Sequence, residues 1–169
     1  MEVTENTLFR NMSEQHITFD AMAKKIVDWM NQDMNKDYVL AIGTDSQTCA
    51  DTKVVLSVTV HRLNSGGIFF LHTDHHKAFK NNQLQQKLYE ETQASLDAAE
   101  ILIKKMNEHG LDIQNSSNIH LQIHMDIGEH GPTKKYIQEL EGWVRAVGYD
   151  CEIKPRSYAA STIADKYSK

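Results

Sequence analysis

With 169 residues, 40% of them hydrophobic and 24% charged, the chain has the length and composition of one globular domain without a disordered tail. It contains no apolar run of the roughly 18 residues that a membrane span needs, and its polar, acidic start is unlike a signal peptide. The net charge of −5 disfavours a protein that binds nucleic acid through basic surface alone, although a bound divalent cation would change the local sign.

The N-terminal region, residues 1–37, is expected to form a helical extension packed on the domain. Thr18 is placed to cap a helix, and Asp20 favours its first turn. Apolar residues between Phe19 and Met30 recur at helical spacing, so one face of this helix is expected to be buried.

Three strands with short connections are expected next. Residues 38–42 form an unbroken apolar run, typical of a strand buried on both faces, which leads into the polar residues 43–47. Residues 53–62 are rich in β-branched side chains, and residues 68–73 follow a turn of Asn, Ser and Gly. Consecutive strands joined in this way predict an antiparallel meander.

Helices and strands alternate in the second half of the chain. The elements expected there are a helix at residues 82–109, ended by Gly110, strands at residues 119–127 and 151–154, and helices at residues 133–147 and 158–169. A meander followed by this alternation predicts an α/β fold, a mixed five-stranded sheet with helices on both faces. No repeat or linker interrupts the sequence, so residues 1–169 are expected to form a single domain.

Two aspartates come at the ends of strands that could be neighbours. Asp45 follows the first strand and Asp126 ends the fourth. Ligands collect at the carboxyl ends of strands in open α/β sheets, so these carboxylates are expected to meet there if the strands are adjacent. Asp45 alone is equally well explained as a turn residue. His124 shares the strand face of Asp126, where it is either structural or orients a carboxylate.

Glu91 lies on the inward stripe of the long helix, in line with Leu88 and Ser95 at 100° per residue, whereas Glu90 lies on the outer face. A buried carboxylate is costly unless it is paired or bound to metal. The alternative to a metal ligand is a structural carboxylate with a partner such as a buried lysine, a buried arginine or a helix end.

A cluster of carboxylates suits a hard divalent cation, Mg²⁺ or Mn²⁺, which takes oxygen ligands. Two such ions, about 3.5–4 Å apart, can activate water and stabilise the leaving oxygen in phosphodiester cleavage. Without a cation, two unit charges about 4 Å apart repel by about 4 kcal/mol at an effective dielectric of 20. The cluster therefore makes sense if a cation completes it.

A second group of metal-binding residue types, the segment His72-Thr-Asp-His-His76, is expected in a loop before the long helix. Its side chains could hold Zn²⁺ or another transition ion. Alternatively, they are ordinary loop residues or part of a substrate rim.

Three segments of the sequence are distinctive: Ile-Gly-Thr-Asp-Ser-Gln at residues 42–47, His-Met-Asp-Ile-Gly at residues 124–128 and Lys-Pro-Arg-Ser-Tyr-Ala-Ala-Ser-Thr-Ile-Ala-Asp-Lys at residues 154–166. Together they resemble the YkuK family of bacterial ribonuclease H-like proteins. The resemblance extends from about Thr18 onward and implies a ribonuclease H-like fold. The metal-binding acids that it implies are Asp45, Glu91, Asp126 and Asp165, and the residues expected to support them or contact substrate are Ser46, Gln47, His124, Lys154 and Lys166. Helical periodicity alone would make Asp165 a solvated residue, so its place rests on the resemblance.

The leading functional hypothesis is a divalent-metal-dependent nuclease or related phosphodiesterase acting on RNA, a hybrid or branched DNA. A non-catalytic ribonuclease H-like binding protein is the alternative. An actin-like nucleotide-binding domain is a third hypothesis, because residues 43–47 look like an actin-like phosphate loop, but a chain of this length supplies only one of the two domains required. Cys49 and Cys151 lack metal-site spacing and are expected to be free thiols in a reducing cytoplasm.

Overall fold

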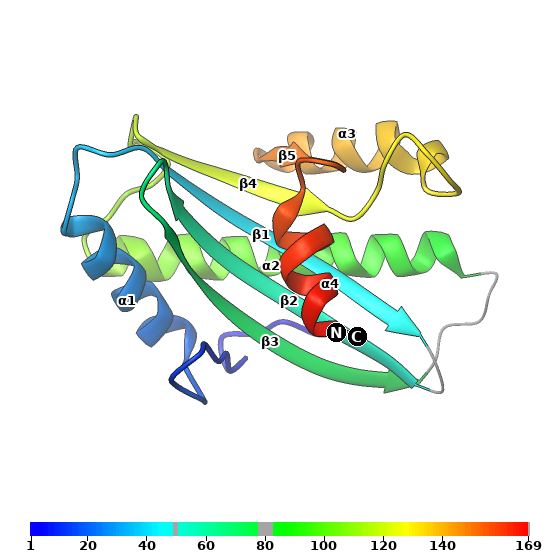
Figure 1. Ribbon diagram of the computed structural model, residues 1–169, viewed down its shortest axis with the longest axis horizontal. Coiled ribbons are helices and arrows are strands. Elements are labelled where there is room, and N and C mark those ends of the chain that lie inside the picture. The colour runs from blue at the N-terminus through cyan, green and yellow to red at the C-terminus, as the bar shows by residue number, and fades with distance from the viewer. Residues whose placement is uncertain (49–50, 78–82, 169) are drawn as a thin grey trace.

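A five-stranded mixed sheet forms the centre of the structure, with helices on both of its faces (Figure 1). The computed structural model describes residues 1–48, 51–77 and 83–168. Its elements are α1 (Phe19–Asn31), β1 (Tyr38–Thr48), β2 (Asp51–Arg62), β3 (Gly67–Lys77), α2 (Leu84–Glu108), β4 (Ile119–Met125), a 3₁₀ turn (Lys134–Tyr136), α3 (Ile137–Val147), β5 (Asp150–Glu152), a π-helical turn (Ala159–Ala164) and α4 (Asp165–Ser168). The predicted α/β architecture is confirmed.

The strand order is β3-β2-β1-β4-β5. β1 pairs antiparallel with β2, and β2 pairs antiparallel with β3, which confirms the predicted meander. β4 runs parallel to β1 on its other side, and β5 runs parallel to β4. β1 is central because its apolar residues, such as Leu40 and Ile42, are buried between the helical layers.

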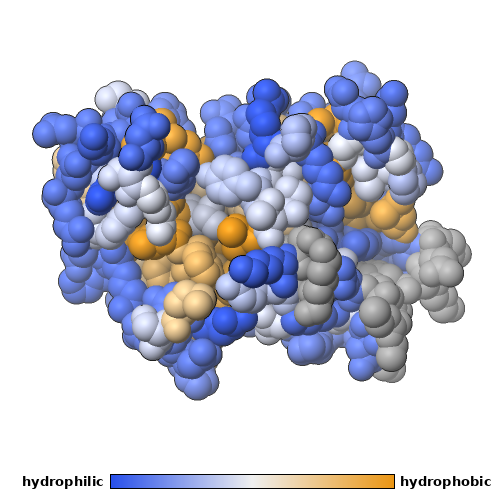
Figure 2. All heavy atoms as spheres, viewed as in Figure 1, coloured by the Kyte–Doolittle hydropathy of each residue, from blue (hydrophilic) through white to orange (hydrophobic). Residues whose placement is uncertain are grey.

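The two faces of the sheet are covered by different parts of the chain. α2 packs against β1 and β4 on one face, with α1 and α3 beside it. The π-helical turn and α4 cover β1 and β2 on the opposite face, and in Figure 1 this red C-terminal segment crosses in front of the sheet while α2 passes behind it. Figure 2 shows that apolar surface on the front face is confined to a few patches among hydrophilic residues.

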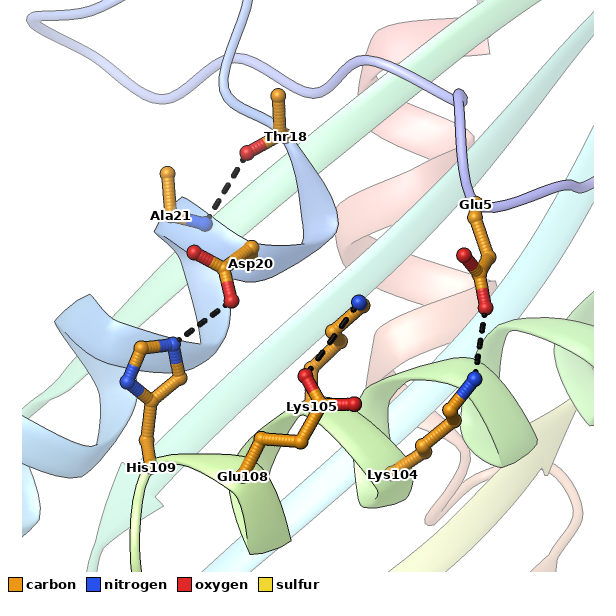
Figure 3. A network of polar contacts seen from close by, with 8 residues as sticks. All are labelled: Glu5, Thr18, Asp20, Ala21, Lys104, Lys105, Glu108 and His109. Atoms are coloured by element: carbon orange, nitrogen blue, oxygen red, sulfur yellow. Dashed lines mark hydrogen bonds and ion pairs between the residues drawn. The ribbon is translucent and has the colours of Figure 1, made fainter.

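The N-terminal extension is held to α2 by exposed polar contacts (Figure 3). Thr18 caps α1 as predicted, since its hydroxyl accepts from the backbone N–H of Ala21 at 3.1 Å. The Asp20 carboxylate lies 2.9 Å from Nε2 of His109, at the end of α2. A further ion pair joins Glu5 to a lysine of α2. Such exposed contacts contribute little each, so the buried apolar face of α1 supplies most of the docking energy.

Two strands are longer than predicted, so two polar segments that were expected after strands lie within them. β1 continues through residues 43–47, which were predicted to follow the strand, because its pairing with β2 extends to Thr48. β3 likewise continues through the segment His72–His76, which was predicted to be a loop, and ends at Lys77. The predicted end of β1 and the predicted loop are both wrong: a long antiparallel partner supplies the backbone hydrogen bonds that allow polar residues to remain in a strand.

The second half of the chain differs from the predictions mainly at element boundaries. The helix predicted at residues 133–147 begins as a 3₁₀ turn, and the terminal helix begins as the π-helical turn. Gly110 and Gly148 end helices with left-handed backbones, φ 87° and 106°, as helix-ending glycines do. Cys151 is a buried free thiol, whereas Cys49 lies outside the described residues. Within the described ranges, no helix is long and apolar enough to cross a membrane.

Gly43 allows the C-terminal segment to approach β1 closely. A Cβ atom at this position would lie 2.5 Å from the backbone nitrogen of Ala160 and 2.9 Å from the carbonyl carbon of Ala159. The Ser57 hydroxyl lies across the same contact, 3.3 Å from the carbonyl oxygen of Gly43 and 2.6 Å from that of Ala159. Strand and C-terminal segment therefore meet backbone to backbone.

Replacing Gly43 with alanine is expected to destabilise the protein by about 1–3 kcal/mol, because the new methyl group meets rigid backbone and forces the C-terminal segment away. Urea unfolding measures this effect. Gly142→Ala in α3 is the matched control: nothing lies within 4 Å of its added Cβ, and alanine favours a helix by up to about 1 kcal/mol. Equal stability of Gly43→Ala and the unmodified protein would contradict the close contact.

Candidate acidic site

The pairing of β1 with β4 brings Asp45 and Asp126 to the same level of the sheet. The parallel register ends with Thr44 opposite Met125, so the next residue on each strand is an aspartate. Asp126 follows the end of β4, as predicted, but Asp45 lies within β1 rather than after it. Asp45 is buried, and 22% of the Asp126 side chain is exposed.

Alternate residues of β1 face different layers. Thr44 and Ser46 face α2, where the Thr44 hydroxyl lies 2.8 Å from the Ser95 hydroxyl and Ser46 donates to Oε1 of Glu91 at 2.5 Å. Asp45 has the opposite orientation, shared with Gly43, toward the C-terminal segment. Acidic groups therefore reach the end of the β1–β4 pair from both layers.

Glu91 is buried on the inward stripe of α2, where its spacing predicted it, with 7% of the residue exposed. The pKa of its carboxyl group is raised from 4.5 to about 8, mainly by burial and in part by the charges of Asp45 and Asp126. The ammonium of Lys87, 3.5 Å from Oε1, and the Ser46 hydroxyl oppose this rise. Without another cation, Glu91 is therefore largely protonated at neutral pH.

A small cavity of about 10 Å³ separates α2 from the end of the β1–β4 pair. Glu91 and Asp126 both line it. This volume corresponds to roughly one water-sized sphere. The two carboxylates thus share a space that fits a single small ligand.

Lys154 forms an ion pair with Asp126, with its Nζ 2.9 Å from Oδ1. Its backbone N–H donates to the carbonyl oxygen of Ile127 at 2.8 Å. The stem of the side chain lies along Gly128, where a Cβ atom would be 3.2 Å from that of Lys154. The segments 124–128 and 154–166 therefore meet at Asp126.

His124 is buried beneath the C-terminal segment. Its Nδ1 accepts from the backbone N–H of Ala159 at 3.1 Å, so Nε2 carries the proton and donates to the Gln122 side chain at 3.0 Å. The ring packs edge-on against Tyr158, with centroids 4.6 Å apart. Burial lowers its pKa from 6.5 to about 4, so the imidazole is neutral at pH 7. These contacts assign His124 to holding the C-terminal segment rather than to orienting an acid.

The structure gives less information on the last three predicted site residues, which are Gln47, Asp165 and Lys166. Asp165 begins α4, but its side chain lies outside the described part of the structure. Lys166 is exposed, and its ammonium lies 5.6 Å from the ring centroid of Tyr167. Gln47 is half-buried near the end of β1.

The histidines of β3 do not assemble into a site in the described structure. His72 contacts the carbonyl oxygen of Leu8 through Nδ1 at 2.7 Å, and His76 lies 3.1 Å from the Asp74 carboxylate. Among the described residues, here or at the acids, no group of three or more His, Cys, Asp or Glu side chains is arranged to hold a metal ion. The description does not include the Asp165 side chain.

Sequence reasoning missed Lys87 and Thr44. Lys87 lies four residues before Glu91, the spacing at which helical side chains meet, so their contact could have been predicted from the sequence. The contact of Thr44 with Ser95 depends on how α2 docks on β1, which no local pattern reveals.

Comparisons with known proteins agree with this architecture. Residues 21–169 match a family model described as ribonuclease H-like. The chain is 31% identical over 176 residues to the uncharacterized protein YkuK of Bacillus subtilis (strain 168), an alignment that covers 99% of this chain and 100% of that protein. No solved structure gave a significant match. The resemblance noted from the three sequence segments is confirmed.

Proposed function

Because the chain belongs to the ribonuclease H-like family, we propose that it is a divalent-metal-dependent nuclease or related phosphodiesterase. One observation carries the proposal: β1, α2 and the end of β4 gather three carboxylates, and the charges of Asp45 and Asp126 add to the burial that raises the pKa of Glu91. Such an arrangement opposes stability in the absence of a cation, which is the pattern expected of a functional site.

Asp45, Glu91, Asp126 and Asp165 are the residues that would hold Mg²⁺ or Mn²⁺, since all four offer the oxygen ligands that these ions prefer. When bound, the cation would activate water and stabilise charge on the leaving oxygen. Ser46 positions Glu91 through its hydroxyl, and the half-exposed Lys154, which is paired with Asp126, would contact a phosphate group of the substrate. We propose RNA, an RNA–DNA hybrid or branched DNA as substrate, in the cytoplasm.

The proposal is tested by cleavage of labelled RNA, hybrid and branched DNA with Mn²⁺ or Mg²⁺. Asp45→Asn and Asp126→Asn are each expected to reduce the cleavage rate by at least about a hundredfold, because each removes charge that would hold the cation. Asp28→Asn is the matched control, since Asp28 lies in an exposed ion pair on α1 and should leave cleavage unchanged. Metal-dependent cleavage that survives both site substitutions would exclude this cluster as the active site.

A second candidate is a binding protein that retains the fold without catalysis. Two lysines next to the acids favour it, because Lys87 lies 3.5 Å from Glu91 and Lys154 lies 2.9 Å from Asp126, where a cation would bind. Thermal unfolding combined with the cleavage assay separates the two candidates, because a cation that binds only the folded protein raises Tm with its concentration whether or not catalysis follows. A rise in Tm with no turnover of any of these substrates would favour the binding protein.

A further inference from the structure

Two acids of the candidate site each have a lysine beside them, but the two lysines are held differently. Lys87 and Glu91 lie one turn apart on α2, and 26% of the Lys87 side chain is exposed. Lys154 reaches Asp126 from the segment after β5, and 48% of its side chain is exposed. Lys87 is therefore tied to the helix that carries its partner, whereas Lys154 extends toward the surface.

The backbone of Lys154 is held by a hydrogen bond, whereas its ammonium ends a half-exposed side chain. Its backbone N–H donates to the carbonyl oxygen of Ile127. Because Gly128 has no side chain, the aliphatic stem of Lys154 can lie against its backbone. Within the described part of the structure, the ammonium has one partner, the Asp126 carboxylate at 2.9 Å. A lysine ammonium is a compact charge on a flexible four-carbon stem, so it can leave this carboxylate without any movement of the backbone.

We propose that Lys154 is an exchangeable counter-ion that alternates between Asp126 and a backbone phosphate of a bound polynucleotide. In the cation-free protein, the ammonium neutralises Asp126 beside the buried Glu91. When a divalent cation occupies Asp126, Lys154 is repelled from the carboxylate and turns toward solvent, where a phosphodiester can accept its hydrogen bond. This inference rests on the proposed function.

The exchange predicts opposite effects of one substitution on two ligands. Removing the ammonium takes away a competitor for Asp126, so the cation should bind more tightly. The same change removes a phosphate contact, so a polynucleotide should bind more weakly. A lysine that merely stabilised the fold would not shift the two affinities in opposite directions.

The first measurement is calorimetric titration of the full-length protein with Mn²⁺ at pH 7.5. Lys154→Met is expected to bind Mn²⁺ about two- to fivefold more tightly than the unmodified protein, the range set by partly exposed ion pairs. Lys154→Gln removes the same charge but keeps a polar side chain, so it should show the same increase if the methionine variant fails to fold. Lys154→Arg keeps the charge and should bind Mn²⁺ with the affinity of the unmodified protein. Lys24→Met removes a lysine from the exposed ion pair with Asp28 and should change nothing. Equal or weaker Mn²⁺ binding by both Lys154→Met and Lys154→Gln would overturn the exchange.

The second measurement is binding of a fluorescein-labelled RNA–DNA hybrid in Ca²⁺, with its integrity checked on a gel. Lys154→Met should weaken binding several-fold. It should also reduce the magnitude of the slope of log K against log salt by about 1, the change expected for the loss of one phosphate contact. Unchanged hybrid binding, or a loss confined to inorganic phosphate titrated alone, would overturn the phosphodiester role. Absence of Mn²⁺ binding by every variant would instead refute the proposed metal site, so the two failures are distinguishable.

Discussion

Replacing Glu91 with glutamine is expected to stabilise the cation-free protein at pH 8 by on the order of 4 kcal/mol. The folded-state pKa of about 8 lies above the ordinary value of 4.5, so the folded protein binds this proton more readily than the unfolded chain. Stability from this group is therefore fully present below pH 4.5 and is lost as pH rises through 8. Glutamine never acquires the buried charge, and its amide oxygen can still accept from Ser46.

Urea unfolding in EDTA at pH 5 and pH 8 measures the effect, which should be large at pH 8 and small at pH 5. Glu90→Gln is the matched control, because Glu90 lies one position away on the outer part of α2 and accepts from Gln86. Titration with Mn²⁺ should reverse the order of stability, since glutamine removes a proposed ligand charge. A gain at pH 8 no larger than that at pH 5 would show that Glu91 carries no buried charge.

Replacing His124 with leucine is expected to destabilise the protein at pH 7 by about 2–4 kcal/mol. The substitution leaves the buried N–H of Ala159 without its acceptor and removes the edge-on contact with Tyr158. His124→Asn should recover part of the loss, because its amide oxygen can replace Nδ1 as acceptor. His120→Leu is the control, since His120 is exposed on the same strand.

The pH dependence of stability separates this role of His124 from simple packing. Its folded-state pKa of about 4 lies below the ordinary value of 6.5, so the unfolded chain binds the proton more readily. The stability that His124 contributes is present above pH 6.5 and is lost as pH falls through 4, by on the order of 3 kcal/mol. Urea midpoints measured between pH 7 and pH 4 should fall less steeply for His124→Leu than for the unmodified protein. Parallel curves would contradict a buried, neutral imidazole.

Features that depend on local periodicity were predictable from the sequence. The inward position of Glu91 follows from 100° per residue on α2, and the Thr18 cap follows from residue type and spacing. The nearness of Asp45 and Asp126 follows from strand ends once β1 and β4 are known to be parallel neighbours. Each inference needed only the geometry of one element or one pairing rule.

Features that depend on contacts between distant segments were not predictable. Residues 43–47 look like a loop because they are polar, yet they remain in β1, where α2 satisfies one row of hydroxyls and the C-terminal segment covers the opposite face. The packing of the Lys154 stem against Gly128 also joins distant segments and could not be predicted from the sequence. Asp165 could be selected only by resemblance, since its place on a short terminal helix carries no amphipathic signal.

The contact of Gly43 with the C-terminal segment has a consequence for how the molecule forms during synthesis. The hydrogen bond from Ser57 to Ala159 joins residues 102 positions apart, and the strand carrying Asp45 leaves the ribosome long before the segment that covers it. Contacts of such sequence separation close late in folding. A nascent chain therefore carries its acidic residues before the layer over Asp45 exists, and the complete site is expected to mature only on release of the C-terminal residues.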